Sequence, residues 1–285
     1  MKPVELVHTV ELFPALSAAL LHLLKNLPDT AWDRATACQT WSVKDVVAHL
    51  LGGNLGRLSF GRDRLTQPKL NISPKNYAEL VDYINRQNEE WVNAARRISP
   101  KLLIEFLELT DPQLYRYFKA LPPFEPGGSA VAWAGFDVSS AERQSPHWFD
   151  IAREYTEKWL HQQHIREAVN QPLLVERKWL FPVLDTFMRA LPHTYRRIDA
   201  ADGVAIWFHI AGEAGGDWSL VRQKGVWRLF SGETPHAVSV VRLDQDIAWR
   251  LFTKGISQGA AQARIQSERD VVLGLRILEL VSIMA

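Results

Sequence analysis

Residues 41–50 read WSVKDVVAHL, and this stretch predicts the first turns of a helix. Ser42 is a suitable N-cap, because its side-chain oxygen can accept a hydrogen bond from a backbone N–H of the first turn. Asp45 lies three residues later, where it can complete a capping box, although Glu or Gln is more usual there. His49 lies at the margin of the apolar face, where it could be a metal ligand or a hydrogen-bonded core residue. That apolar face consists of Val43, Val46, Val47, Leu50 and Leu51.

A second polar pattern follows more than a hundred residues later, where residues 157–161 read EKWLH. It lies within a helix predicted over residues 148–169. Glu157, His161 and His164 occupy positions i, i+4 and i+7, so their side chains share one face. The spacing is compatible with a solvated polar stripe. It is also compatible with a metal site in which Glu157 and His161 bind one ion and His49, from a facing helix, supplies the third ligand.

The rest of the N-terminal sequence predicts further helices. Apolar residues recur at helical spacing over residues 4–27, where Pro14 indicates either a kink or a later start. Two more helices are predicted over residues 74–99 and 101–120. Residues 121–146 are rich in Pro, Gly and Ser, so they form a long connection that either covers a pocket or simply packs against the bundle.

The pattern changes after Pro172. A helix over residues 173–191 is followed by short runs rich in β-branched and aromatic residues, and helices over 244–254 and 270–284 end the chain. We therefore expect two domains, an all-α bundle over residues 1–170 and an α+β domain over residues 171–285. The short runs predict a meander of strands at residues 203–210, 218–221, 226–230 and 237–241.

Charge and composition exclude some classes of partner. The 33 Lys and Arg residues balance 32 Asp and Glu residues, which disfavours binding to nucleic acid or to an anionic membrane. The apolar fraction of 47% is typical of a globular protein. The 11 Trp residues could line a ligand cleft, but large aromatic side chains more often fill cores. A small-molecule substrate is the expected partner, and both a monomer and a homodimer remain open.

Cys38 is the only cysteine, so neither an intrachain disulfide nor a cysteine-based metal cluster is expected. We expect it to pack as a small hydrophobic residue. We also find no pattern of a signal peptide or a membrane anchor, and the cysteine usage suits a reducing cytoplasm.

The two motifs WSVKDVVAHL and EKWLH, in this order, resemble the mycothiol-dependent maleylpyruvate isomerase family. That family belongs to the DinB-like superfamily of metal-binding four-helix bundles. The resemblance implies a DinB-like four-helix bundle followed by an α+β domain that looks like a sterol-carrier domain. It also implies that His49, Glu157 and His161 are the metal ligands.

His164 stands where the family often has Asp, so it could orient His161 or compete as a further ligand. The resemblance also implies a catalytic basic residue in the second domain, for which Arg250 and Lys254 are the candidates. Each of these could equally be a solvated residue at a helix end. The two are not interchangeable where a planar guanidinium grips a carboxylate.

The implied function is a metal-dependent isomerase or S-transferase that uses a low-molecular-weight thiol on a small electrophile. Zinc is the first expectation, and nickel, iron or manganese also suit two histidines and a carboxylate. The thiol could be mycothiol, bacillithiol or glutathione. Two alternatives remain: a non-catalytic protein that binds a small molecule or lipid, and a hydrolase that uses the ion to activate water.

Overall fold

The structure, a computed structural model, describes residues 1–38, 40–66, 77–127 and 145–280. These residues divide into two compact units. One contains residues 8–127 and 145–174, and the other contains Met1–Val7 and residues 175–280. The helical unit therefore extends a few residues beyond the predicted boundary, and the first seven residues belong with the C-terminal unit. Whether residues 1–170 and 171–285 fold independently stays a prediction.

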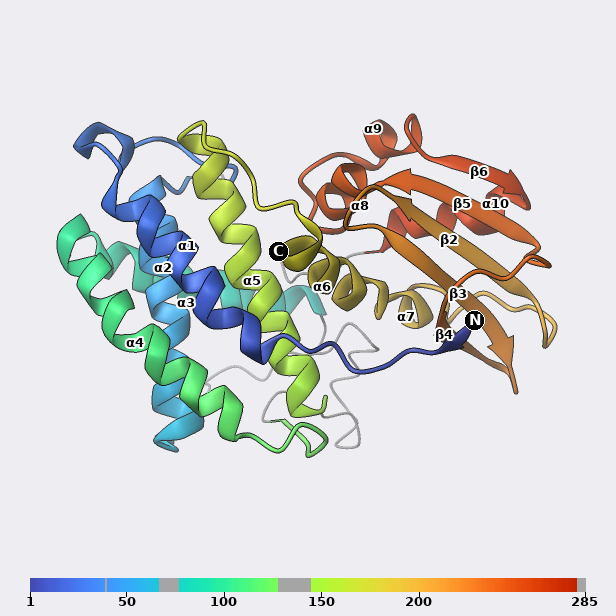
Figure 1. Cartoon of the computed structure of the whole chain (residues 1–285), viewed down its shortest axis with the longest axis horizontal. Helices are drawn as coiled ribbons and strands as arrows, with labels where there is room; N and C mark the ends of the chain where they lie inside the picture. Colours follow the sequence, from blue (N-terminus) through green and yellow to red (C-terminus); the bar gives the residue numbers. More distant parts are fainter. Residues whose placement is uncertain (39, 67–76, 128–144, 281–285) are drawn as a thin grey trace. The chain divides into compact units, whose positions relative to one another are not determined.

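The first unit is a helical bundle, as the sequence predicts (Figure 1). Helices α1, α2, α4 and α5 pack against one another, and α3 packs against α2. Leu20, Leu24, Val47 and Leu103 are among the buried side chains of the shared core. The helices span Phe13–Lys25 (α1), Val43–Gly56 (α2), Tyr77–Ala95 (α3), Pro100–Ala120 (α4) and His147–Ala168 (α5).

The ends of these helices follow local sequence signals. Ser42 Oγ accepts from the backbone N–H of Asp45 at 3.3 Å, and Asp45 Oδ2 accepts from the N–H of Ser42 at 3.1 Å. The predicted capping box of α2 is thus confirmed. Helix α1 begins at Phe13 rather than near residue 4, because Pro14 has no N–H to donate and therefore fits the first turn. The predicted start of α3 and most of the connection over residues 121–146 lie outside the described residues.

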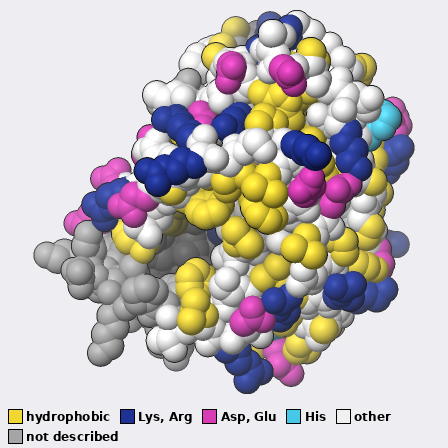
Figure 2. All heavy atoms as spheres, turned by 90° about the vertical axis from the view of Figure 1, so that its left-hand side faces the viewer, with side chains coloured by type: hydrophobic (Ala, Val, Ile, Leu, Met, Phe, Trp, Pro, Cys, Tyr) yellow, Lys and Arg dark blue, Asp and Glu magenta, His cyan; other side chains and the backbone are white. Residues whose placement is uncertain are grey.

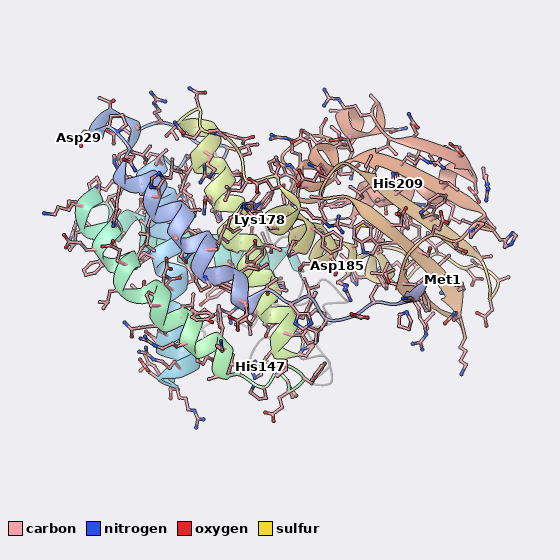
Figure 3. The ribbon with its side chains drawn as sticks, viewed as in Figure 1. Met1, Asp29, His147, Lys178, Asp185 and His209 are labelled. Atoms are coloured by element: carbon pink, nitrogen blue, oxygen red, sulfur yellow. The ribbon has the colours of Figure 1, made fainter. Side chains whose placement is uncertain are left out.

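Short helical segments complete this unit. The 3-10 turns Val10–Leu12 and Asp29–Ala31 flank α1, and a π-helical turn over Arg57–Arg62 continues α2. Asp29 and His147, labelled in Figure 3, lie at opposite ends of the unit. Figure 2 looks onto the helical unit and shows apolar side chains gathered between charged ones. Exposed apolar side chains of α4 are Leu102, Phe106 and Leu109.

The second unit is built on a mixed sheet with the order β1-β4-β3-β2-β5-β6. Strands β2, β3 and β4 form the predicted antiparallel meander. The predicted meander is wrong for β5. Residues 232–238 return the chain to the start of β2, so β5 runs parallel to β2 and pairs with the edge of β2 that β3 does not use. The strands span Lys2–Pro3 (β1), Ala205–Ala211 (β2), Gly216–Gln223 (β3), Val226–Ser231 (β4), Ser239–Asp244 (β5) and Gln266–Arg269 (β6).

Helices pack on the sheet of this unit. Asp185 on α6, labelled in Figure 3, accepts hydrogen bonds from Trp218 Nε1 on β3 at 2.9 Å and from Arg189 at 2.7 Å. Strand β6 and helix α9 are absent from the sequence prediction. The predicted helix over 270–284 is only a short turn followed by a 3-10 turn, and residues 281–285 lie outside the described part. The helices span Arg177–Met188 (α6), Leu191–Thr194 (α7), Gln245–Phe252 (α8), Gln258–Gln262 (α9) and Val271–Gly274 (α10), followed by the 3-10 turn Leu275–Glu279.

Large aromatic side chains fill both units. Trp159 and Tyr155 are fully buried in the helical unit, and Trp218, Trp249 and Phe208 are fully buried in the other. The preferred interpretation of the tryptophans as core residues holds for these positions. Within the described residues, no helix combines the length and the apolar character that a membrane span requires.

Candidate metal centre

Helices α2 and α5 bring His49, Glu157 and His161 together. Nε2 of His49 and Nε2 of His161 each lie 3.0 Å from Oε1 of Glu157. One ligand atom from each of the three residues lies within 4.8 Å of the others. The three residues that the sequence singles out therefore converge on one point, as a three-ligand metal site requires.

The local structure fixes each of these side chains. The capping box sets where α2 begins, and the ring of Trp41 packs against His49 with ring centroids 5.0 Å apart. On α5, the fully buried Trp159 donates from Nε1 to the backbone carbonyl of Leu174 at 2.9 Å. Since Trp159 and Glu157 lie on different sides of α5, this anchoring sets the rotation that directs Glu157 and His161 toward α2.

The three side chains differ in exposure. The His49 and His161 side chains are 12% and 11% exposed, whereas that of Glu157 is 42% exposed. The interpretation of this helix face as a solvated stripe is therefore wrong for His161, because the bundle surrounds α5 on more than its apolar side. The open side of the group is at the carboxylate.

Charges within the group stabilise one another. Burial would raise the pKa of Glu157, but the charges and hydrogen bonds of His161 and His49 outweigh burial and hold it well below its usual value. Burial would lower the pKa of His161, but Glu157 and Cys38 outweigh this and raise it to about 10. Glu157 is thus ready as an anionic ligand, and a divalent ion would replace the proton on His161.

Cys38 is a neighbour of this group that the sequence analysis did not predict. Its Sγ lies 3.0 Å from Nδ1 of His164 and 3.6 Å from Nδ1 of His161. Burial would raise the pKa of this thiol, but the hydrogen bonds with His161 and His164 lower it to about 6. Cys38 packs against the core as expected, yet its sulfur faces two imidazoles. Its place three residues before Trp41 was the only sequence signal.

His164 does not join the group formed by His49, Glu157 and His161. It instead contacts Cys38, which in turn contacts the ring of His161. Whether His164 orients His161 or acts as a further ligand, the two roles considered from the sequence, stays a prediction.

A small pocket borders the group and is lined by residues of α1, α2, α4 and α5. It has a volume of about 30 Å³, and His49, Glu157, Phe13, Leu114 and Lys158 are among its lining residues. This volume holds about one or two water molecules. It is too small for a larger ligand.

Comparison with known families agrees with this geometry. Residues 13–166, more than half of the chain, match the family described as the mycothiol maleylpyruvate isomerase N-terminal domain. The chain belongs to this family. The match contains both motifs and all three residues of the His49, Glu157 and His161 group. No curated protein matches the sequence.

Two solved structures share the fold of this member of the mycothiol maleylpyruvate isomerase family. They are crystal structures of the mycothiol-dependent maleylpyruvate isomerase and of a histidine-to-alanine mutant of it. Each matches with a TM-score of 0.51 and 11% sequence identity, over 94% of this chain and 96% of the other. The combination of a helical bundle with an α+β unit is therefore shared along nearly the whole chain.

Arg250 and Lys254, which the resemblance to the maleylpyruvate isomerase family suggests as catalytic, lie in the C-terminal unit. Nε of Arg250 lies 3.0 and 3.1 Å from the two carboxylate oxygens of Asp246. Its guanidinium also lies over the ring of Trp249. Lys254 follows the end of α8 with a φ of 58°. Because these residues belong to a different unit from His49 and Glu157, their catalytic role stays a prediction.

Proposed function

We propose that this protein is a metal-dependent isomerase or S-transferase that uses a low-molecular-weight thiol on a small electrophilic substrate. The observation that carries the proposal is the convergence of His49, Glu157 and His161, in which the Glu157 carboxylate is half-buried. Membership of the mycothiol maleylpyruvate isomerase family supports the choice of a thiol. The likeness in fold to a mycothiol-dependent maleylpyruvate isomerase is consistent with an isomerisation.

The donor set suits a divalent ion. Two imidazole nitrogens and one carboxylate oxygen are common ligands of catalytic zinc, and three protein ligands leave one coordination position open. Nickel, iron and manganese accept the same donors. Nδ1 of His161 faces the sulfur of Cys38, which leaves Nε2 directed at Glu157 for the ion.

A divalent ion held there would supply a Lewis acid that lowers the pKa of a bound thiol. Addition of the thiolate to a conjugated double bond forms a carbon–sulfur bond and moves the π electrons toward the activating carbonyl. The carbon–carbon bond that remains can rotate. Expulsion of the thiolate then restores the double bond in the other geometry, whereas protonation of the adduct leaves the thiol transferred.

His49, Glu157 and His161 have three tasks in this scheme. They hold the ion, they balance part of its charge through the carboxylate, and they leave its open side toward solvent. The pocket of about 30 Å³ beside His49 and Glu157 is too small for the thiol, so the thiol would bind at the part of Glu157 that is open to solvent. Arg250 or Lys254 would bind the carboxylate of an acidic substrate, as the family resemblance suggests.

The pocket beside His49 and Glu157 is compatible with a second candidate, a metal-dependent hydrolase. A water molecule beside His49 and Glu157 would fit the pocket and could be activated by the same ion. This alternative needs no thiol, so the two candidates differ in whether sulfur binds to the ion.

The test is a titration of the cobalt-substituted Cys38→Ser protein with mycothiol or bacillithiol. The substitution removes the protein's own thiol, so a sulfur-to-cobalt charge-transfer band reports the added one. We expect a band that saturates and the release of about one proton per thiol near neutral pH. The same titration of Cys38→Ser combined with His49→Ala should give no band. A cobalt-loaded Cys38→Ser protein that shows no band at saturating thiol excludes the thiol-using proposal and favours the hydrolase.

A further inference from the structure

A second group of metal-ligating side chains lies beside the first in the helical unit. Sγ of Cys38, Nδ1 of His161 and Nδ1 of His164 come from one loop and one helix, and their ligand atoms lie within 4.8 Å of one another. The group shares His161 with the first one but uses the other nitrogen of its ring, because Nε2 faces Glu157.

The loop that carries Cys38 is held in place by its backbone. Residues Ala35 and Ser42 form a β-bridge across it. Inside the bridge, Thr36 Oγ1 accepts from the N–H of Cys38 at 3.1 Å and donates to the carbonyl of Trp41 at 2.8 Å. The N–H of Trp41 donates to the carbonyl of Cys38 at 3.0 Å. These hydrogen bonds define the backbone position from which the Cys38 side chain projects toward α5.

The two imidazoles are also fixed. His161 and His164 are three residues apart on α5, so they lie on one face, and their ring centroids are 5.4 Å apart. His161 is buried and His164 is half-buried. Both rings turn Nδ1 toward the same sulfur.

We propose that Cys38, His161 and His164 form a second metal site that binds a soft divalent ion such as zinc. A thiolate and two imidazoles select zinc over magnesium or calcium, which prefer oxygen ligands. Tetrahedral zinc holds such ligand atoms about 3.3–3.6 Å apart. The observed sulfur-to-nitrogen distances of 3.0 and 3.6 Å are close to this spacing. Binding transfers the thiol proton and any proton on Nδ1 of either ring to solvent.

The shared ring couples the two sites. A neutral imidazole carries one proton, so His161 can bind ions through both nitrogens only if it loses that proton as well. Filling the site at Cys38 therefore weakens binding at the site formed by His49, Glu157 and His161. The inference does not depend on the reaction proposed above, because it concerns only which side chains bind the ion.

The test measures cobalt binding with no thiol in the buffer. His49→Ala removes a ligand of the first site and leaves the second intact, and Glu157→Gln serves the same purpose if His49→Ala does not fold. We expect a sulfur-to-cobalt charge-transfer band in wild type and in His49→Ala. In the His49→Ala protein, the additional substitution Cys38→Ser should abolish the band. The additional substitution His164→Ala should weaken cobalt binding to the His49→Ala protein about tenfold or more.

Two results would overturn the proposal. One is the absence of a band at saturating cobalt in folded His49→Ala and Glu157→Gln proteins. The other is a His49→Ala protein whose cobalt affinity does not change when His164→Ala is added, because His164 would then not be a ligand. Circular dichroism establishes that each variant is folded. Failure here is distinct from failure of the proposed function, which is tested with Cys38→Ser and an added thiol.

Discussion

Nε2 of His49 lies 3.0 Å from Oε1 of Glu157, although the two residues are 108 positions apart in the chain. The contact joins the second helix to the fifth, so it forms only when the bundle has folded. A group assembled in this way links metal binding to the folded state.

Removal of a ligand should remove the ion. In the Cys38→Ser background, we expect about one zinc ion per chain and expect Glu157→Gln to abolish most of it. His161→Ala should abolish most of the bound zinc even when Cys38 is present, since the His161 ring belongs both to the group with His49 and Glu157 and to the group with Cys38 and His164. Elemental analysis after dialysis measures the content. His22→Ala, an exposed histidine on α1, is the matched control and should retain the wild-type content.

Loss of the buried Lys158 should destabilise the bundle. Its Nζ lies 2.5 Å from Asp111 Oδ1, which also accepts from Asn54 at 2.7 Å, and both charged side chains are buried. Lys158→Met leaves the Asp111 carboxylate without its cation, so we expect a loss of about 3–5 kcal/mol of unfolding free energy in urea. Adding Asp111→Leu should restore most of it. If the double variant were no more stable than Lys158→Met, the ion pair would not be the cause.

Two adjacent glycines of α2 should respond in opposite ways to alanine. A Cβ at Gly52 would lie 2.5 Å from Nε1 of Trp91, which donates to the backbone carbonyl of Ala48 at 2.7 Å. Gly52→Ala should therefore cost about 1–3 kcal/mol. At Gly53 no atom lies within 4 Å of the added carbon, so Gly53→Ala should stabilise by about 0.5–1 kcal/mol. Thermal unfolding of both variants measures the contrast, and an equal response would contradict it.

Asp45 should make the stability depend on pH. Burial would raise the pKa of Asp45, but Arg96 and Ser42 outweigh burial and hold it below the usual value. A carboxyl group with a lowered pKa in the folded state stabilises the fold above the unfolded pKa of about 3.9, and this contribution is lost as pH falls through the folded pKa.

Asp45→Asn should accordingly destabilise by about 1–2 kcal/mol at neutral pH, since the capping box and the Arg96 ion pair are both weakened. The difference from wild type should shrink as pH falls below about 4. Urea unfolding across this range measures it. Asp63→Asn, which removes an exposed ion pair with Arg62, should change little at any pH. A difference at Asp45 that does not vary with pH would rule out the charge as its origin.

The helical unit should fold alone, and its stability should depend on whether residues 171–174 are included. Leu174 accepts from Trp159 Nε1 and donates to Gln163 Oε1, each at 2.9 Å. Arg166 also donates to the carbonyl of Pro172 at 3.0 Å and accepts from the N–H of Gln171 at 2.8 Å. A fragment of residues 8–174 should unfold cooperatively, whereas residues 8–170 should be less stable by about 2–4 kcal/mol, because these four hydrogen bonds are lost. Urea unfolding compares the two. Equal stability would mean that residues 171–174 do not belong to this unit.

Local signals in the sequence were sufficient for much of the fold. The capping box of Ser42 and Asp45 sets the start of α2, and Pro14 is compatible with the first turn of α1. These features depend on backbone groups within a few residues. Where strand pairing joins distant segments, the sequence was less informative. The parallel pairing of β5 with β2 and the short strand β1 follow from competition among sheet edges, which no local pattern records.

The candidate site also has features that the sequence determines and others that only the tertiary structure determines. The sequence determines that Glu157 and His161 share a helix face, since 3.6 residues per turn place i and i+4 together. It also carries the two motifs that relate the chain to its family. Only the tertiary structure brings His49 to Glu157 and the Cys38 sulfur to His161 and His164. Those distances depend on how α2, α5 and the loop before α2 pack, and this packing is decided by contacts between residues that are far apart in the sequence.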